Sequence, residues 1–289
     1  REYLLSKDIP RDFAVLDGKD PADFDYIHYT IDQADVYFIT NQTTDRKLID
    51  CQFRVSELQP ELWDALTGEI REAKAFIQKD GLTNVSLTLE PYGAVFVVFN
   101  KPIDKDFQGK AERNYSDYKK LQEITGEWTV NFDQEWGAPA EVKFPELISW
   151  PDHDNEGIKY YSGAGFYTKS MDVPADWLAS GRKVYLDLGE VRELAEVFVN
   201  GKSAGVLWNP PYKADITELV KAGSNDIKIE VMNLWCNRLA GDNELPEDER
   251  FTSTNITTHG YRTDPNYWLL QPAGLLGPVR LVPSVLINP

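Results

Sequence analysis

The sequence is poor in the residues that build disulfide frameworks and metal centres, with two cysteines and three histidines in 289 residues. Cys51 and Cys236 fall in different predicted domains, so we expect no structural disulfide between them. His28, His153 and His259 lie far apart, and none belongs to an H-x-x-H or H-E-x-x-H motif. This spacing argues against a zinc enzyme.

Long apolar runs and excess positive charge are also missing. No apolar run approaches the roughly 20 residues that span a bilayer, so we expect no membrane span. The net charge of -17 argues against a nucleic-acid partner, because phosphates would be repelled. The chain begins with neither an initiator Met nor the apolar region of a signal peptide, so we expect a mature or truncated chain.

Strand patterns dominate the first part of the chain. Residues 34–41 are β-branched and aromatic, and residues 49–55 alternate between apolar and polar side chains. Residues 83–100 give two strands around a turn at Pro91–Gly93. The short spacing between strands predicts a small antiparallel β-sandwich over residues 33–100.

Two segments flank this predicted sandwich. Residues 1–32 show little periodicity, so they are either a leading strand with loops or the tail of another domain, and we place them outside the sandwich. Residues 101–123 are charged and poor in apolar side chains, so they are expected to be a linker or an edge segment.

A second run of strands covers residues 124–289. Residues 126–133 and 225–235 alternate, and Asn200-Gly201 between two apolar runs is a strong signal for a hairpin. About eight strands in this length fit a jelly roll. The predicted fold class is therefore all-β, with two antiparallel β-sandwich domains.

Exposed aromatic residues are the best candidates for binding, because an aromatic face matches the apolar C–H face of a sugar ring. Trp208, Tyr212, Trp235 and Trp268 lie in or beside predicted loops, and we predict them as carbohydrate-binding residues. Packing in the core or in a seam between domains is the more ordinary alternative for each. Trp128 alternates with apolar neighbours and is expected to point inward.

The acidic loop over residues 151–157 is the single place with some metal-binding character. Calcium needs six to eight oxygen ligands, and Asp152 and Asp154 with their neighbours offer too few on their own. An ordinary acidic loop is the main expectation, and a structural calcium ion near Asp152 and Asp154 is the alternative. No other cofactor is predicted.

Two sets of segments resemble glycoside hydrolases. The segment "WPDHDNEGIKYYSGAGFYTKSMDVP" (150–174) and the closing "WLLQPAGLLGPVRLV" (268–282) resemble the sugar-binding, galactose-binding-like domain of family 2 enzymes. The segments "YIHYTIDQADVYFITNQ" (26–42) and "LEPYGAVFVVF" (89–99) are similar to family 106 α-L-rhamnosidases. The family often has Arg where this chain has Tyr29, after His28.

This resemblance implies that the chain is the C-terminal portion of a secreted or periplasmic bacterial enzyme that acts on plant polysaccharide. The partners it implies are carbohydrate and the missing catalytic barrel of the same polypeptide, with residues 1–32 as the trailing segment of that barrel. No catalytic acid or base of the family maps onto this sequence, so we expect no hydrolysis by this chain alone. The alternative is a free-standing carbohydrate-binding module.

Overall fold

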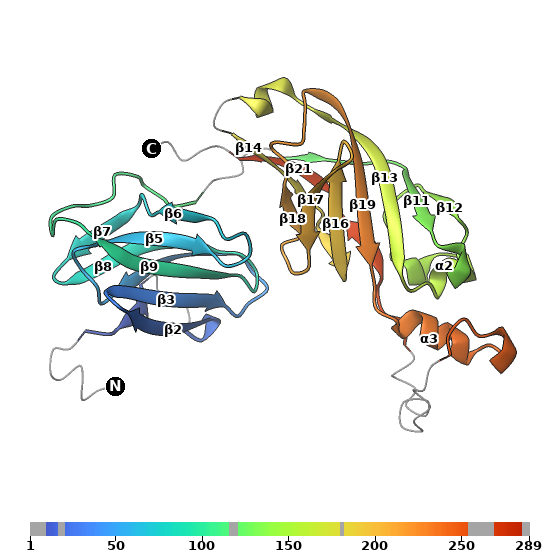
Figure 1. The fold of residues 1–289 in the computed structure, drawn as a ribbon, viewed down its shortest axis with the longest axis horizontal. Coiled ribbons are helices and arrows are strands. Elements are labelled where there is room, and N and C mark those ends of the chain that lie inside the picture. Colours follow the sequence, from blue (N-terminus) through green and yellow to red (C-terminus); the bar gives the residue numbers. More distant parts are fainter. Residues whose placement is uncertain (1–9, 17–20, 116–120, 180–181, 254–268, 285–289) are drawn as a thin grey trace. The chain divides into compact units, whose positions relative to one another are not determined.

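The chain forms two separate structural units, each with its own hydrophobic core. The first comprises residues 1–117 and 286–289, and the second residues 118–285. Both are built from antiparallel sheets, which confirms the predicted all-β class (Figure 1). The computed structural model describes residues 10–16, 21–115, 121–179, 182–253 and 269–284. Within these ranges no helix is both long and apolar enough to cross a membrane.

The first unit is a sandwich of two sheets. Its strands are β1 (Phe13–Val15), β2 (Phe24–Ile31), β3 (Ala34–Asn41), β4 (Lys47–Phe53), β5 (Leu58–Asp64), β6 (Ile70–Glu72), β7 (Phe76–Lys79), β8 (Leu82–Leu89) and β9 (Ala94–Pro102). One sheet has the order β1-β4-β8-β7, and the other has the order β2-β3-β9-β5-β6. The turn at Pro91–Gly93 leads from β8 in one sheet to β9 in the other. The predicted alternation of β4 is confirmed, because Ile49, Cys51 and Phe53 are all buried in the core.

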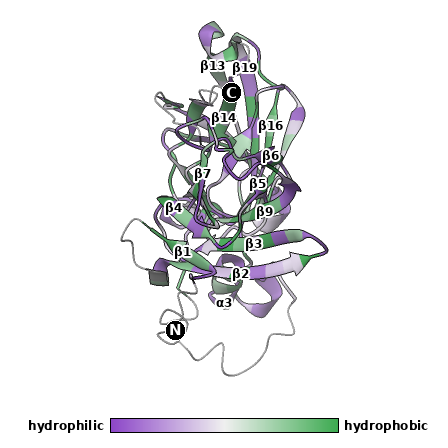
Figure 2. Ribbon diagram, turned by 90° about the vertical axis from the view of Figure 1, so that its left-hand side faces the viewer, coloured by the Kyte–Doolittle hydropathy of each residue, from purple (hydrophilic) through white to green (hydrophobic). Residues whose placement is uncertain are grey.

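The predicted separation of residues 1–32 from this sandwich differs from the structure. β1 pairs with β4, and β2 pairs with β3 from end to end. β2 lies at the edge of its sheet, and Phe24 is the single buried side chain in it. An edge strand with so little burial keeps no apolar alternation, so its sequence does not signal a strand. Hydrophilic and hydrophobic residues are mixed along β2 and β3 (Figure 2).

Residues 103–115 form an edge segment on the first sandwich. The side-chain oxygen of the buried Asn114 accepts hydrogen bonds from the backbone N–H groups of Lys74 and Ala75 at 2.6 and 2.7 Å. Gln78 on β7 donates from Nε2 to the carbonyl of Phe107 at 2.8 Å. These bonds satisfy backbone groups beside β7, so this part of the predicted linker belongs to the first sandwich.

Glu61 on β5 is a buried carboxylate with a lowered pKa. Burial alone would raise the pKa of Glu61, but hydrogen bonds from Lys101 Nζ at 2.6 Å and Trp63 Nε1 at 3.0 Å outweigh it. The pKa therefore lies below its ordinary value of 4.5. Above this ordinary pKa, the ionised carboxylate of Glu61 stabilises the folded state. This stabilisation is lost as the pH falls through the pKa that Glu61 has in the folded state.

A pH series of denaturation curves tests this linkage. We expect Glu61→Gln to be less stable than the parent chain near neutral pH, with a difference that shrinks between about pH 6 and about pH 3. Urea denaturation of both proteins at each pH gives the two free energies of unfolding. A difference that stays constant over this range would contradict the linkage.

The second unit is a larger sandwich. Its strands are β10 (Gln122–Glu123), β11 (Trp128–Phe132), β12 (Glu141–Phe144), β13 (Ala164–Val173), β14 (Lys183–Asp187), β15 (Glu190–Arg192), β16 (Leu194–Val199), β17 (Lys202–Leu207), β18 (Lys213–Asp215), β19 (Gly223–Met232), β20 (Gly274–Gly277) and β21 (Arg280–Ser284). A six-stranded sheet, β12-β11-β13-β19-β16-β17, lies opposite a four-stranded sheet, β10-β21-β14-β18, and β15 pairs with β20.

Short helices lie between some strands. The α-helices are α2 (Glu156–Lys159) and α3 (Cys236–Asn243). The 3-10 helices are η1 (Pro21–Asp23), η2 (Gln134–Trp136), η3 (Trp150–Asp152), η4 (Ala175–Leu178) and η5 (Glu247–Glu249). The two cysteines, Cys51 and Cys236, are both free in the structure.

The predicted hairpin at Asn200-Gly201 is confirmed. Val199 pairs with Lys202 across the turn, and Asn200 and Gly201 have φ angles of 50° and 79°. Both positions are in the left-handed region that a type I′ turn requires, which Gly adopts freely and Asn tolerates. The hairpin places β16 and β17 at one edge of the six-stranded sheet.

Candidate functional site

Trp208 ends the hairpin and is widely exposed. It follows β17 directly, and 63% of its surface is accessible. Leu194 on β16 pairs with Met232 on β19, and both are exposed, at 36% and 45%. Their chain neighbours Ala195 and Val231 are buried, so Leu194 and Met232 point to the outer face of the sheet. We call Leu194, Met232 and Trp208 the apolar row.

Trp235, a second predicted residue, is half exposed and packs edge-on against another tryptophan. Its ring centroid lies 4.9 Å from that of Trp136, with the planes at 71°. Trp235 keeps 51% of its surface accessible. It directly precedes α3, the helix that follows β19 along the chain. Trp208 and Trp235 are therefore both exposed, and carbohydrate binding by them stays a prediction.

Tyr212 and Trp268 have different positions. Tyr212 is only 8% exposed, belongs to the core of the second sandwich, and donates its hydroxyl to the carbonyl of Glu193 at 2.9 Å. A ring packed on the core offers no open face for a sugar, so the core alternative holds for Tyr212. Its pKa is raised, chiefly by burial. Trp268 lies outside the described residues.

Buried polar side chains help to hold helix α3 in place. Arg238 and Asp242 are almost fully buried, and the Nε of Arg238 donates to Asp242 Oδ1 at 2.9 Å. Asp242 also accepts from the backbone N–H groups of Phe251 and Thr252 at 3.2 and 2.8 Å. Burial lowers the pKa of Arg238, and the charge of Asp242 opposes this shift.

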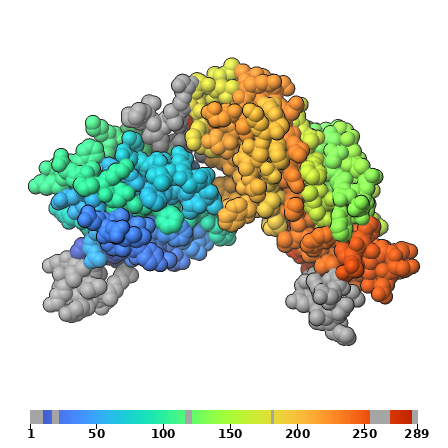
Figure 3. Space-filling model, in the orientation of Figure 1, coloured from blue at the N-terminus to red at the C-terminus, as the bar shows by residue number. Residues whose placement is uncertain are grey.

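Two further bonds attach the same helix to a distant segment. Asn237 donates from Nδ2 to the carbonyl of Gln271 and accepts from its N–H group, both at 2.8 Å. Helix α3 therefore anchors residues 251–252 and residue 271, which lie on either side of the undescribed stretch 254–268. Figure 3 shows α3 and its flanking segments, in orange, as a surface lobe of the second unit.

The acidic loop uses its side chains as helix caps. Asn155 accepts at Oδ1 from the N–H of Ile158 at 3.2 Å, and His153 Nδ1 accepts from the N–H of Asn155 at 3.0 Å. Among the described residues, no group of three or more His, Cys, Asp and Glu side chains could hold a metal ion. Calcium near Asp152 and Asp154 remains an untested prediction.

The pentapeptide Gly201–Gly205 has the pattern G-x-S-x-G, which in hydrolases marks a nucleophilic serine at a strand-to-helix turn. Here Ser203 lies on β17 of an antiparallel hairpin and is exposed. Its hydroxyl donates to Glu196 Oε1 at 2.7 Å. The context required for a nucleophile is missing at this position, so the match is a coincidence of sequence.

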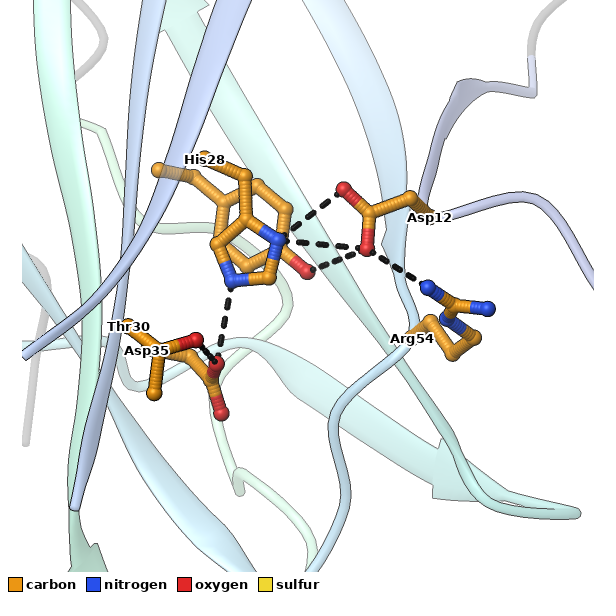
Figure 4. A network of polar contacts seen from close by, with 6 residues as sticks. Asp12, His28, Thr30, Asp35 and Arg54 are labelled. Atoms are coloured by element: carbon orange, nitrogen blue, oxygen red, sulfur yellow. Dashed lines mark hydrogen bonds and ion pairs between the residues drawn. The ribbon is translucent and has the colours of Figure 1, made fainter.

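The first unit contains a polar network around His28 that the sequence did not predict (Figure 4). His28 Nδ1 lies 3.0 Å from Asp12 Oδ2, and Nε2 lies 3.0 Å from Asp35 Oδ1. Its ring stacks on Tyr37 with centroids 4.0 Å apart. Arg54 Nη2 is 3.3 Å from Asp12 Oδ1. Because carboxylates only accept, the doubly protonated imidazole is the form that can donate to both.

This network joins the two sheets of the first sandwich. Asp12 precedes β1 and Arg54 follows β4 in one sheet, whereas His28 and Asp35 lie on β2 and β3 in the other. A two-residue turn between Ile31 and Ala34 sets the register that brings His28 opposite Tyr37. The turn residues are Asp32 and Gln33, not the Asn-Gly pair of the common signal, which is why the hairpin escaped prediction.

Comparison with known proteins shows that both sandwiches are similar to parts of glycoside hydrolases. Residues 154–267 match the model of the glycosyl hydrolase 2 galactose-binding domain-like family. Residues 1–77 match the model of glycoside hydrolase family 106, described as alpha-L-rhamnosidase. The chain is thus family 106-like and carries a galactose-binding-like β-sandwich of the family 2 type, as the sequence resemblance predicted.

Two individual relatives extend this result. The structure of a rhamnosidase from Novosphingobium sp. PP1Y is 34% identical, with a TM-score of 0.84 over 98% of this chain and 26% of that one. A protein of Formosa agariphila with the provisional name beta-glucuronidase is 40% identical over 183 residues, covering 57% of this chain and 16% of its own length. This chain therefore spans about a quarter or less of the length of these relatives.

Proposed function

We propose that this chain is a pair of non-catalytic β-sandwich domains from the C-terminal part of a bacterial α-L-rhamnosidase-like enzyme, secreted or periplasmic, that acts on plant polysaccharide. The domains support the catalytic barrel of the same polypeptide and contact carbohydrate. The likeness to a rhamnosidase over 98% of this chain but 26% of that protein supports this role.

The observation that carries the proposal is the apolar row of Leu194, Met232 and Trp208. Leu194 and Met232 pair on adjacent strands, Trp208 directly follows β17, and the three leave 36%, 45% and 63% of their surfaces exposed. Contiguous apolar side chains on a surface mark sites of interaction, because their contact with water is unfavourable. Burying these apolar side chains against a neighbouring protein domain is more favourable than leaving them exposed to water.

A complex-formation assay tests the docking role. We expect the 289-residue chain to co-sediment with a separately produced family 106 catalytic domain. The double variant Leu194→Asp/Met232→Asp should abolish the complex, because two buried charges would be unpaired in the interface. Leu269→Asp, at a site with 59% exposure, serves as the control and should bind normally. Hydrolysis of an aryl α-L-rhamnoside by the chain alone would contradict the non-catalytic assignment.

The second candidate function is a free-standing carbohydrate-binding module. The half-exposed Trp235, which packs edge-on against Trp136, favours it, because an open indole ring can stack on a sugar. Oligosaccharide binding that is lost in Trp208→Ala or Trp235→Ala, together with no complex with the catalytic domain, would select this function instead.

A further inference from the structure

The outer face of the six-stranded sheet contains an open groove of about 750 Å³ in the second unit. It lies over β11, β13, β19 and β16, away from the apolar row and from Trp235. Its lining includes hydroxyl, ammonium, carboxylate and phenyl groups, namely Thr129, Thr168, Lys228, Phe198, Glu127 and Asp226. None of the comparisons assigns a ligand to this face.

Four lining residues form a row across four adjacent strands. Thr129 pairs with Thr168, Thr168 with Lys228, and Lys228 with Phe198. Side chains that pair across neighbouring strands point to the same face of a sheet. At the usual spacing between strands, the row is about 14 Å long. From β11 to β16, the row therefore presents two hydroxyls, then an ammonium group, then a phenyl ring.

Lys228 is held in place by aromatic rings and not by a carboxylate. Its Nζ lies 4.4 Å from the ring centroid of Phe198 and 5.2 Å from that of Phe166. Within the described part of the chain, this ammonium forms no hydrogen bond or ion pair. The cation–π contacts orient the group and leave its three N–H donors free for a ligand.

Acceptors line the groove beside this row, and Asp226 is two residues from Lys228 on β19. Asp226 accepts at Oδ1 from the hydroxyl of Ser170 at 2.9 Å, and its other oxygen carries further lone pairs. Glu127 is mostly exposed, and its carbonyl accepts from Lys169 Nζ at 2.7 Å. The charged lining residues are Lys169, Lys228, Glu127 and Asp226, two of each sign. The groove is therefore balanced in charge within a chain of net charge -17.

From this arrangement we propose that the groove binds a neutral oligosaccharide. A sugar hydroxyl both donates and accepts, so it matches a lining that pairs the donors of Lys228 with the acceptors of Asp226. The ring of Phe198 gives apolar surface for the C–H face of a pyranose. Balanced charge gives no net attraction for a polyanion. This proposal rests on the carbohydrate contact proposed above and places it on the sheet face instead of at the tryptophans.

Calorimetry with the 289-residue chain tests the proposal. The probes are short neutral oligosaccharides of the cello-, xylo-, manno- and galacto-series, with oligogalacturonate as the anionic probe. We expect at least one neutral series to bind and oligogalacturonate to bind more weakly. Lys228→Gln and Phe198→Leu should each weaken neutral binding by at least about tenfold, because each removes a direct contact.

The matched control is Lys159→Gln. Lys159 also lies over an aromatic ring, with Nζ 5.5 Å from the centroid of Tyr160, but it is on α2 and outside the groove. Its substitution should leave affinity unchanged, and circular dichroism confirms the fold of each variant. Absence of binding by every neutral series, or equal or tighter binding of oligogalacturonate, would overturn the proposal.

The outcomes also separate this proposal from the previous one. Binding that survives Lys228→Gln and Phe198→Leu but is lost in Trp235→Ala would place the sugar at the tryptophans. The assignment of the binding site to the groove would then be wrong, and the proposed carbohydrate contact would be correct. The docking role is measured by complex formation with the catalytic domain, and it can succeed or fail independently of any oligosaccharide.

Discussion

Replacement of Asp242 by alanine is expected to lower the free energy of unfolding of the second unit by about 3–5 kcal/mol. Asp242 is 4% exposed and is the carboxylate partner of Arg238, which is 3% exposed. Without Asp242, the guanidinium stays buried without its counter-charge, which costs far more than the net contribution of the pair. The N–H groups of Phe251 and Thr252 lose their acceptor as well.

Tryptophan fluorescence during urea denaturation measures this change, because seven of the eight tryptophans, all except Trp63, belong to the second unit. Asp248→Ala is the control: this exposed residue in η5 lies six positions further along the chain and should change stability by less than about 0.5 kcal/mol. The double variant Arg238→Met/Asp242→Ala should recover part of the loss. A loss below about 1 kcal/mol for Asp242→Ala would contradict a buried, paired charge.

The second large effect on stability is expected from removal of the hydroxyl oxygen of Tyr167. The hydroxyl of Tyr167 is fully buried and accepts from Trp150 Nε1 at 2.6 Å and from the N–H of Leu275 at 3.1 Å. Burial is the main cause that raises the pKa of Tyr167. Tyr167→Phe keeps the ring but leaves two buried donors without an acceptor, so we expect a loss of about 2–5 kcal/mol.

The same fluorescence assay tests this prediction. Tyr160→Phe is the matched control, because it removes a hydroxyl from a partly exposed ring of the same unit, and we expect a change below about 0.5 kcal/mol. Trp150→Phe/Tyr167→Phe should be less destabilised than the sum of the single variants, since the two residues share one hydrogen bond. Strict additivity would show that the bond contributes nothing.

The strand pattern allowed much of the fold to be predicted where one face of a strand is buried. The alternation of β4, the inward position of Trp128 and the hairpin at Asn200-Gly201 all agree with the structure. Each depends on local chemistry: a period of two in apolar residues, or a turn that needs positive φ. The edge strand β2 lacks both signals, so residues 1–32 were separated from a sandwich that contains β1 and β2.

The candidate site was less accessible to prediction from sequence. The sequence around an aromatic residue near a loop does not indicate whether its ring faces solvent or the core. Tyr212 is buried and Trp208 is exposed, although they are only four residues apart. The groove around Lys228 was not predicted, because its row of residues comes from four strands that are distant in the sequence. The network around His28 likewise joins residues 12, 28, 35 and 54.

The sequence by itself determined the class of fold and the family resemblance, because periodicity and segment order are properties of the chain alone. Tertiary structure decided which side chains meet, which are exposed, and where charges are buried. Sheet pairing brings together residues far apart in the chain, and the free-energy cost of an unpaired buried group depends on partners that only the folded state supplies.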